Sequence, residues 1–279
     1  MEGELIAGRF AVEEKIGTGA MGTVHRARDM LTGQLVALKV LHAPGEHAER
    51  FAREAAAIAE ISHPGAVRYV AHGILSTGEP FLAMQWIEGE TLAKRLQRGK
   101  LSIRDTLILG RRIAAALGAA HARKLVHRDV KPANVMLAGG AVDTATLVDF
   151  GLARRSTSLE VTRTNMLVGT PAYIAPEQAR GDDELDVRSD LYSLGITLFH
   201  LATGRVPFTG KSQGAILVRH ILEEVPDPRS VRSDLSESFA GILHRLTRKR
   251  PEDRFASAEA AAEAIEAVLA VRPATARIA

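Results

Sequence analysis

The sequence contains no cysteine, so neither a disulfide framework nor a thiolate metal site can form. It also lacks an excess of charge of one sign, because 36 Lys and Arg residues face 33 Asp and Glu residues and leave a formal net charge of +3. This balance does not indicate nucleic-acid binding, and we expect no nucleic acid among the partners. The absence of cysteine fits a reducing compartment, so a cytoplasmic location is expected.

Long hydrophobic runs are missing as well. The most apolar run, from Leu191 to Thr203, is interrupted by Ser193 and His200 and is too short to span a bilayer, as is typical of a buried core helix. The first residues, MEGELIAGRF, lack the basic segment and apolar stretch of a signal peptide. We therefore expect no membrane contact from this segment, and an anchor outside these residues stays an open alternative.

The order of expected elements divides the chain in two. Its 279 residues, 46% hydrophobic and 25% charged, suit one large globular domain or two lobes. Strands broken by turns are expected over residues 10–40 and 81–87, and helices over residues 50–61, 104–123, 189–203 and 257–270. The change from strands to helices near Glu88-Gly89 predicts a boundary between an N-lobe, residues 1–87, and a C-lobe, residues 88–270, followed by a tail, residues 271–279.

A glycine-rich segment, GTGAMGTV, covers residues 17–24. Gly17, Gly19 and Gly22 allow backbone N–H groups to close over phosphate oxygens without a Cβ in the way. A plain glycine-rich turn is an alternative, and dinucleotide-binding folds share the spacing. The segment that follows, TVHRARD, reads as a strand rather than a helix, which argues against a dinucleotide fold.

The segment VALK places Lys39 at the end of an apolar strand. A lysine buried there needs a partner, because an unpaired buried charge is costly. Glu54, fifteen residues on in the helical FAREAAAIAEI, would provide the carboxylate. Both side chains also fit solvated surface positions, and on this segment alone that alternative is preferred.

Two polar segments carry the strongest chemical signal. HRDVKPANVML, from His127 to Leu137, contains a carboxylate at Asp129 that can accept a hydroxyl proton and an amide at Asn134 that can hold a hard cation. LVDFGLA ends an apolar run at Asp149, a position suited to Mg²⁺, although a lone DFG also fits a strand-end turn. Because Asp149 follows Asn134 by fifteen residues, the two side chains could share one metal site.

Taken together, GTGAMGTV, VALK, HRDVKPAN, DFG and APE (residues 175–177) follow the order of the protein-kinase signature. The chain resembles a eukaryotic-like Ser/Thr protein kinase, most like the bacterial branch, over about residues 10–270. The phrases GTPAYIAPEQARG and DVRSDLYSLG add to this resemblance. It implies an α+β, bilobal fold with a small strand-rich N-lobe containing one key helix and a larger, mainly helical C-lobe.

The resemblance also implies roles for single residues. Asp129, Lys131 and Lys39 would be catalytic, with Asp129 as base, Lys131 neutralising the transferred phosphoryl group, and Lys39 on the ATP phosphates, held by Glu54. Asn134 and Asp149 would bind Mg²⁺, with Mn²⁺ as an alternative. The residues around the nucleotide would be Gly17, Gly19, Gly22, Val24, Ala37, Met84 as gatekeeper, and Gln85 to Ile87 as the hinge that reads adenine. Glu177 would pair with Arg254, and Asp190 would brace the catalytic loop; both roles are structural.

Specificity and control are expected from the segment between Asp149 and Glu177. Lys131 and Thr170 indicate Ser/Thr rather than Tyr substrates, although Thr170 also fits a simple loop residue. Thr162 and Thr164 resemble activation-loop phosphorylation sites, and Arg128, just before Asp129, would bind their phosphates.

The expected function is phosphorylation of protein Ser and Thr by ATP and Mg²⁺, with autophosphorylation of the activation loop and a homodimer for the reaction in trans as an open alternative. A pseudokinase that binds nucleotide without catalysis is the main rival, and Lys39, Asp129, Asn134 and Asp149 speak against it. A small-molecule kinase is a third hypothesis. The segment GTPAYIAPE argues against it, because it resembles a loop that positions a peptide substrate.

Overall fold

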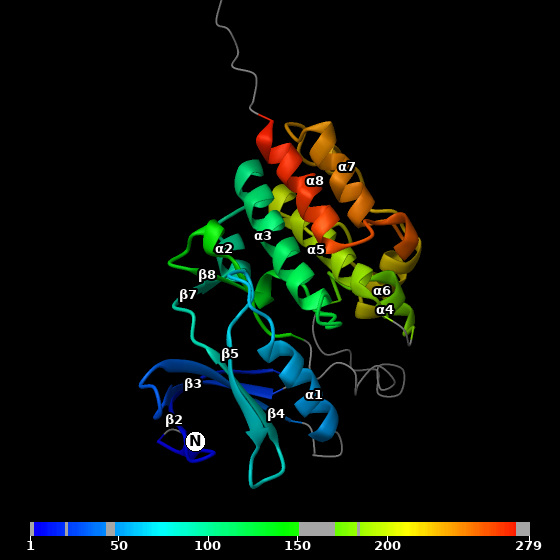
Figure 1. Cartoon of the computed structure of the whole chain (residues 1–279). Coiled ribbons are helices and arrows are strands. Elements are labelled where there is room, and N and C mark those ends of the chain that lie inside the picture. Colours follow the sequence, from blue (N-terminus) through cyan, green and yellow to red (C-terminus); the bar gives the residue numbers. More distant parts are fainter. Residues whose placement is uncertain (1–2, 20–21, 43–47, 151–170, 183–184, 272–279) are drawn as a thin grey trace, which may run out of the picture.

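The computed structural model describes residues 3–19, 22–42, 48–150, 171–182 and 185–271, without the side chains of residues 48–50. Strands gather at one end of the molecule and helices at the other (Figure 1), which confirms the predicted α+β division into two lobes. The division at residue 87 itself stays a prediction. None of the described helices combines the length and the hydropathy that crossing a membrane requires.

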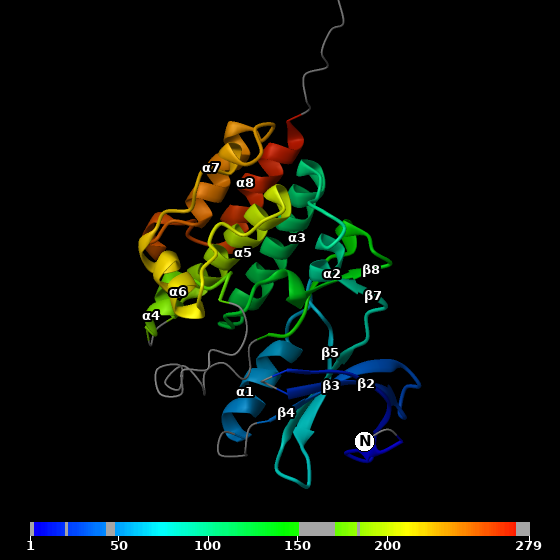
Figure 2. The ribbon, with the colours of Figure 1, turned by 180° about the vertical axis from the view of Figure 1, so that it is seen from behind.

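The strand-rich lobe is built on an antiparallel sheet in the order β1-β2-β3-β4-β6-β5. Its strands are β1 (Leu5–Ile6), β2 (Phe10–Gly19), β3 (Gly22–Asp29), β4 (Leu35–Leu41), β5 (Tyr69–Ile74) and β6 (Pro80–Gln85). The helix α1 (Ala48–Ala59) packs on this sheet against β5 and β6 (Figures 1 and 2). One face of the sheet buries a small core of its own that includes Phe10, Val36, Leu38 and Phe81.

A second, smaller sheet follows where the chain enters the helical lobe. It has the order β7-β8-β9, formed by β7 (Gly89–Thr91), β8 (Val135–Ala138) and β9 (Thr146–Leu147). Gly89 has φ +156°, and a Cβ at this position would collide with the carbonyl oxygen of Leu137 on β8. Glycine therefore allows the backbones of β7 and β8 to approach each other.

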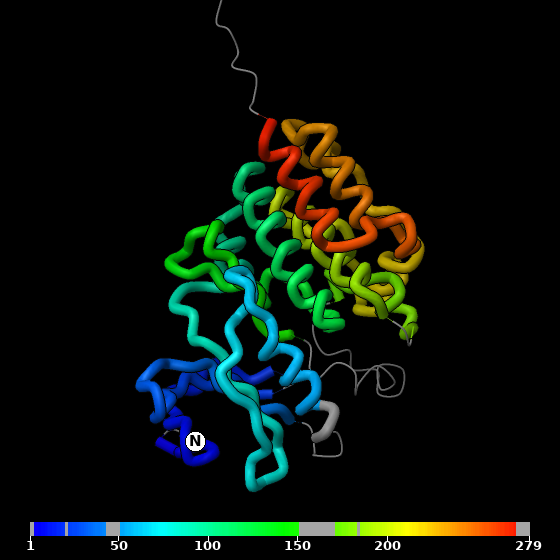
Figure 3. Tube along the Cα trace, viewed as in Figure 1, coloured from blue at the N-terminus to red at the C-terminus, as the bar shows by residue number. Residues whose placement is uncertain are grey.

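The helical lobe is formed by α2 (Leu92–Leu96), α3 (Ile103–His121), α4 (Pro176–Arg180), α5 (Val187–Thr203), α6 (Gln213–Leu222), α7 (Glu237–Leu246) and α8 (Ala258–Ala270). Short 3-10 turns, η2 (Pro132–Asn134), η3 (Val142–Thr144), η4 (Pro228–Ser230) and η5 (Pro251–Asp253), connect them. α5 runs through the lobe and is buried over most of its length, while α3 packs against both α5 and α8 (Figure 3).

Local sequence signals explain where these helices begin and end. The side-chain oxygens of Ser102, Asp186 and Ser257 accept hydrogen bonds from backbone N–H groups in the first turns of α3, α5 and α8. Gly204, at φ +82°, ends α5 in the left-handed conformation that favours glycine. The predicted long helices agree with α1, α3, α5 and α8 to within about two residues at each end, the usual uncertainty of a helix boundary.

Candidate active site

One face of the large sheet gathers four residues that the resemblance assigns to the nucleotide. In the strand register, Val24 lies opposite Lys39, and Ala37 lies opposite Met84. Directly opposed residues share a face and alternate residues along a strand return to it, so all four side chains lie on one face. Leu82, opposite Lys39, also lies on this face and belongs to the main hydrophobic core.

The glycine-rich segment forms the end of the β2–β3 hairpin. Gly19 pairs with Gly22, and Gly17 pairs with Val24. At Gly22 a Cβ would collide with the carbonyl oxygen of Val40 on the neighbouring strand, so β3 and β4 approach each other more closely than a larger residue allows. The hairpin therefore ends beside the strand that carries Lys39.

Lys39 on β4 is buried and forms an ion pair with Asp149, whose side chain is 35% exposed. Asp149 lies two residues after the end of β9 and has φ +64°, a left-handed conformation that Asp and Asn adopt more readily than other residues with a Cβ. Glu54 lies half-buried on α1. The predicted pair between Lys39 and Glu54 stays a prediction.

The predicted gatekeeper and hinge lie at the end of β6 and just beyond it. Met84, the predicted gatekeeper, is 6% exposed and belongs to the main core. The N–H of Gln85 donates to the carbonyl of Arg68 at 2.9 Å, and the N–H of Trp86 donates to the carbonyl of Leu35 at 3.4 Å. Two of the three hinge N–H groups are thus used within the protein. Ile87 is the remaining residue for the predicted recognition of adenine through a backbone N–H.

The catalytic-loop residues come together around one carboxylate. Lys131 Nζ donates to Asp129 Oδ2 at 2.8 Å, and Asn134 Nδ2 donates to the same oxygen at 3.0 Å and to the Asp129 carbonyl at 2.8 Å. The Asn134 carbonyl accepts the N–H of Val148 at 2.9 Å, which places the residue before Asp149 beside this loop. The two predicted metal ligands therefore leave neighbouring chain segments at the same end of β8 and β9.

His127 is buried between these segments. Its Nδ1 accepts the N–H of Asp129 at 3.2 Å, so Nε2 carries the hydrogen that is donated to the Val148 carbonyl at 3.0 Å. Burial lowers the pKa of His127, which keeps the ring in this neutral form. The ring also lies 4.8 Å from the ring of Phe150, between centroids. His127 thus joins Asp129 to Val148, the residue before Asp149.

Asp190 supports the same loop from α5. Its carboxylate accepts the backbone N–H groups of His127 at 2.8 Å and Arg128 at 2.7 Å. His121, in the last turn of α3, lies with Nε2 2.8 Å from Asp190 Oδ2. Because Asp190 is fully buried, these bonds replace the water that its carboxylate would otherwise need.

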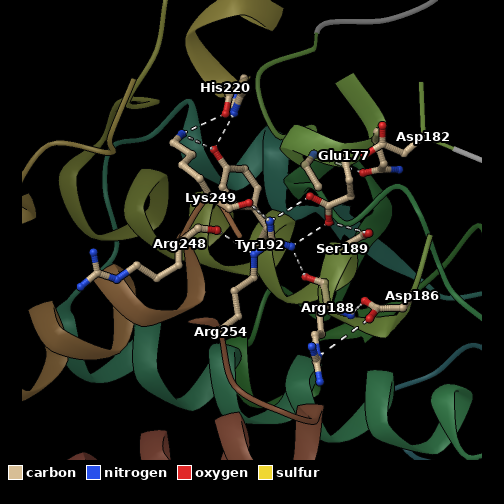
Figure 4. Close-up of polar contacts among 12 residues, drawn as sticks. Glu177, Asp182, Asp186, Arg188, Ser189, Tyr192, His220, Arg248, Lys249 and Arg254 are labelled. Atoms are coloured by element: carbon tan, nitrogen blue, oxygen red, sulfur yellow. Dashed lines mark hydrogen bonds and ion pairs between the residues drawn. The ribbon is translucent and has the colours of Figure 1, made fainter. Parts of the chain in front are cut away.

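A second buried carboxylate lies further along the chain (Figure 4). Arg254 donates to both oxygens of Glu177, at 2.7 and 2.9 Å, and Ser189 donates to one of them at 2.7 Å. Burial alone would raise the pKa of Glu177, but the hydrogen bonds and charge of Arg254 outweigh it and lower this pKa. Removing one partner of such a buried pair typically costs about 3–5 kcal/mol.

The remaining predicted residues, Thr162, Thr164 and Thr170, lie outside the described part of the chain. Two residues that the sequence did not single out support the catalytic loop, one of them through Asp190 and the other directly. One is His121, which bonds Asp190, and the other is Gln178 on α4, whose Nε2 donates to the Arg128 carbonyl at 3.0 Å. A lone histidine at a helix end and a glutamine after APE have many ordinary explanations, and only the fold brings them to this loop.

Comparison with known proteins places these contacts in context. The chain is 36% identical to the serine/threonine-protein kinase pkn3 of Myxococcus xanthus over 95% of its own length and 51% of that protein. It is 36% identical to PknL of Mycobacterium bovis, covering 96% of this chain and 67% of PknL, and 34% identical to PrkC of Bacillus subtilis, covering 92% and 40%. The chain spans about half the length of the first curated relatives that it matches.

A solved structure shares the fold. The crystal structure of Rad53 1–466 in complex with AMP-PNP aligns with a TM-score of 0.75 at 24% sequence identity, over 94% of this chain and 66% of Rad53. The family described as "Protein kinase domain" matches residues 10–265, which include every described site residue above. The chain therefore belongs to the protein kinase domain family.

Proposed function

We propose that this chain transfers the γ-phosphate of ATP to Ser and Thr hydroxyl groups of proteins, with Mg²⁺ as the metal. The observation that carries the proposal is the environment of Asp129, whose Oδ2 accepts hydrogen bonds from both Lys131 and Asn134. The printed names of pkn3, PknL and PrkC, all serine/threonine-protein kinases, support the same reaction.

The nucleotide would lie against the sheet face that carries Val24, Ala37, Lys39 and Met84. Gly17, Gly19 and Gly22 would cover its phosphates, and the N–H of Ile87 would read adenine. Lys39 would hold the α and β phosphates, because its ammonium group lies on this face and is buried there. The bound AMP-PNP of the Rad53 structure supports a nucleotide site in this fold.

The residues present fit a hard cation. Asn134 directs its Nδ2 to Asp129, which leaves its amide oxygen to serve as a ligand, and Asp149 supplies a partly exposed carboxylate. Mg²⁺ is commonly held by one or two such side chains together with substrate phosphates and water, and it would supply charge neutralisation at the phosphates.

Asp129 would accept the proton of the substrate hydroxyl as its oxygen attacks the γ-phosphorus of ATP, and ADP would leave. Lys131 would orient Asp129 and stabilise the negative charge of the phosphoryl oxygens during transfer. Positioning and charge stabilisation supply most of the rate in such reactions, so the hydrogen bonds that fix this loop matter as much as the reacting groups.

The proposal extends to specificity and control. Thr170 would restrict the site to short hydroxyl side chains, and Thr162 and Thr164 would be autophosphorylated, in cis or within a transient homodimer. Arg128 would bind the resulting phosphates, whose charge of about −1.5 to −2 favours a charge-assisted pair with arginine. Glu177 and Arg254 would hold the C-terminal end of the segment between Asp149 and Glu177 to the helical lobe.

The test is phosphate transfer from labelled ATP to three matched peptides that differ only in carrying Ser, Thr or Tyr. We expect transfer to the Ser and Thr peptides and at least a roughly hundredfold loss in Asp129→Asn, since a positioned base contributes about 10²–10⁴-fold. Asp143→Asn, the same change at an exposed position, should behave as the wild type. A wild-type chain that binds ATP but transfers no phosphate to any peptide would instead be a pseudokinase.

A further inference from the structure

Arg128 has an unusual backbone conformation. Its φ is +66°, in the left-handed region that residues with a Cβ adopt only at a cost in energy. The residue directly precedes Asp129, so this conformation sets the direction in which the chain carries the Asp129 carboxylate. Such a conformation persists only when the surrounding structure holds it.

Two side chains bond the backbone of Arg128, one at its N–H and the other at its carbonyl. Asp190 Oδ1 accepts its N–H at 2.7 Å, and Gln178 Nε2 donates to its carbonyl oxygen at 3.0 Å. The carbonyl belongs to the peptide group that joins Arg128 to Asp129. Gln178 therefore fixes the plane of the peptide from which Asp129 extends.

The other end of the same amide contacts a different segment. Gln178 Oε1 accepts the N–H of Ala175 at 3.2 Å. Ala175 is fully buried and packs in a hydrophobic cluster with Tyr192 and Phe199 of α5. One side chain thus links the catalytic loop to the chain segment just before α4, which is anchored in the core of the helical lobe.

Helix capping is the ordinary explanation for this glutamine, and it accounts for only half of the geometry. Gln178 is the third residue of α4, and a Gln or Glu at this position often accepts the N–H of the N-cap residue. Glutamate would cap at least as well, because negative charge is favoured near a helix N-terminus. The amide also donates a hydrogen bond to the Arg128 carbonyl, which an ionised carboxylate cannot do.

We propose that Gln178 is a positioning residue for phosphoryl transfer, acting through the Arg128–Asp129 peptide group on the orientation of Asp129. This inference rests on the proposed kinase activity. It predicts that loss of the donor at residue 178 lowers kcat and leaves the KM for ATP nearly unchanged, because Gln178 bonds the loop that carries Asp129 and not the sheet face that carries Lys39.

Gln178→Glu separates the two explanations in the full chain. The introduced carboxylate keeps the cap but presents only acceptors to a carbonyl oxygen, so we expect roughly a tenfold or greater loss of kcat near pH 8, as small misplacements of reacting groups cause. Protonation of that carboxyl restores a donor. The ratio of variant to wild-type kcat should therefore rise as the pH falls towards about 5.5, since a carboxyl facing a carbonyl oxygen titrates above its ordinary pKa of about 4.3.

Two further variants complete the experiment. Gln178→Met, similar in size but without hydrogen bonds, should lose kcat at every pH, and Gln97→Glu, an exposed glutamine on α2's C-terminal side, should match the wild type throughout. ATP affinity and melting temperature are measured on all four proteins. Wild-type kcat in Gln178→Glu near pH 8, or a loss that no decrease in pH reverses, would overturn the inference alone. A wild-type chain without turnover would overturn the proposed function, and this inference with it.

Discussion

The Oδ1 atom of Asp190 lies 2.7 Å from the backbone nitrogen of Arg128, the residue that precedes Asp129. The other oxygen, Oδ2, lies 2.8 Å from the backbone nitrogen of His127 and 2.8 Å from His121 Nε2. A single carboxylate in the first turn of a buried helix therefore holds two consecutive peptide groups of the catalytic loop. This makes the geometry of the loop depend on α5, the most buried helix of the lobe.

Asp190→Asn should weaken both folding and catalysis. Asparagine keeps one acceptor oxygen but turns an NH₂ group towards a backbone N–H that the wild-type carboxylate accepts, either that of His127 or that of Arg128. A buried donor left without a partner costs about 1–3 kcal/mol, so we expect a loss of that order in the free energy of unfolding, measured by urea denaturation. We also expect a decrease in kcat, because the Arg128 backbone loses a partner.

Asp186→Asn is the matched control for this change. Asp186 is the half-exposed N-cap of the same helix, and asparagine caps helices about as well as aspartate. Its stability and kcat should stay close to those of the wild type. Equal effects of the two substitutions would show that Asp190 acts through the helix terminus and not through the loop.

Asp149→Asn should abolish Mg²⁺-dependent turnover while the fold survives. Asparagine tolerates the left-handed backbone of Asp149, so the substitution removes the charge without adding strain. The expected result is a loss of activity across a Mg²⁺ titration, because one predicted ligand is no longer anionic. An unchanged titration curve and an unchanged maximal rate would remove Asp149 from the metal site. Asp143→Asn, six residues upstream and exposed, provides the control.

Stability should fall with pH below about 6.5 because buried histidines must stay neutral. Burial and the nearby Lys249 charge lower the pKa of His220 to about 4. Between about pH 6.5, the ordinary pKa of histidine, and about pH 4, the unfolded chain binds a proton at this residue that the native state does not. The free energy of unfolding therefore falls by about 1.4 kcal/mol for each unit of decreasing pH, and it is regained as the pH rises to about 6.5. Burial lowers the pKa of His25, His63, His127 and His200 as well, which adds to the effect.

His220→Gln isolates one part of this dependence. The glutamine oxygen can still accept the hydroxyl of Tyr192, which His220 Nδ1 approaches to 3.0 Å. Between about pH 7 and about pH 5 the unfolding free energy of this variant should fall by on the order of 2 kcal/mol less than that of the wild type. His42→Gln, a change at an exposed ring, should keep the wild-type slope. Identical slopes in all three proteins would contradict the assignment to His220.

The order of strand-like and helix-like segments predicted the two lobes and the long helices, because periodic apolar positions are a local signal. The α3 helix shows this, with Ser102 at its start and apolar residues repeating along its buried face. The residues of HRDVKPAN identified Asp129 and Asn134, and the kinase resemblance added Lys131. All three lie within six residues and meet in one cluster. Their closeness in sequence nearly guarantees closeness in space.

The contacts that sequence could not predict join residues far apart in the chain. His121 and Asp190 are 69 positions apart, and Gln178 and Arg128 are 50 apart. Neither pair has a local signal, because their meeting depends on how α3, α4 and α5 pack. The left-handed backbone of Arg128 is equally hidden, since arginine shows no preference for it. Long-range packing thus decides the support of the site, while local motifs decide its chemistry.

All three tyrosines of the chain contact a histidine through the hydroxyl group. The distances to His Nδ1 are 2.6 Å for Tyr69 and His72, 2.8 Å for Tyr173 and His200, and 3.0 Å for Tyr192 and His220. Burial raises the pKa of Tyr173 to about 12 and also raises those of Tyr69 and Tyr192. These hydroxyls are engaged within the fold, so autophosphorylation on tyrosine is not expected.

Incubation with Mg-ATP should therefore place phosphate on Thr162 and Thr164 and none on tyrosine. Intact mass and peptide mapping check the sites, and a Thr162→Ala/Thr164→Ala double variant should show lower activity, because a phosphate on either threonine would form the proposed charge-assisted pair with Arg128. Asp129→Asn, expected to be inactive, should carry no phosphate when incubated alone and should gain it when mixed with the wild type if the reaction runs between two copies. Phosphate that appears on the isolated Asp129→Asn protein would mean that a different enzyme modifies these threonines. Full activity of the double variant would mean that phosphates on these threonines do not control catalysis.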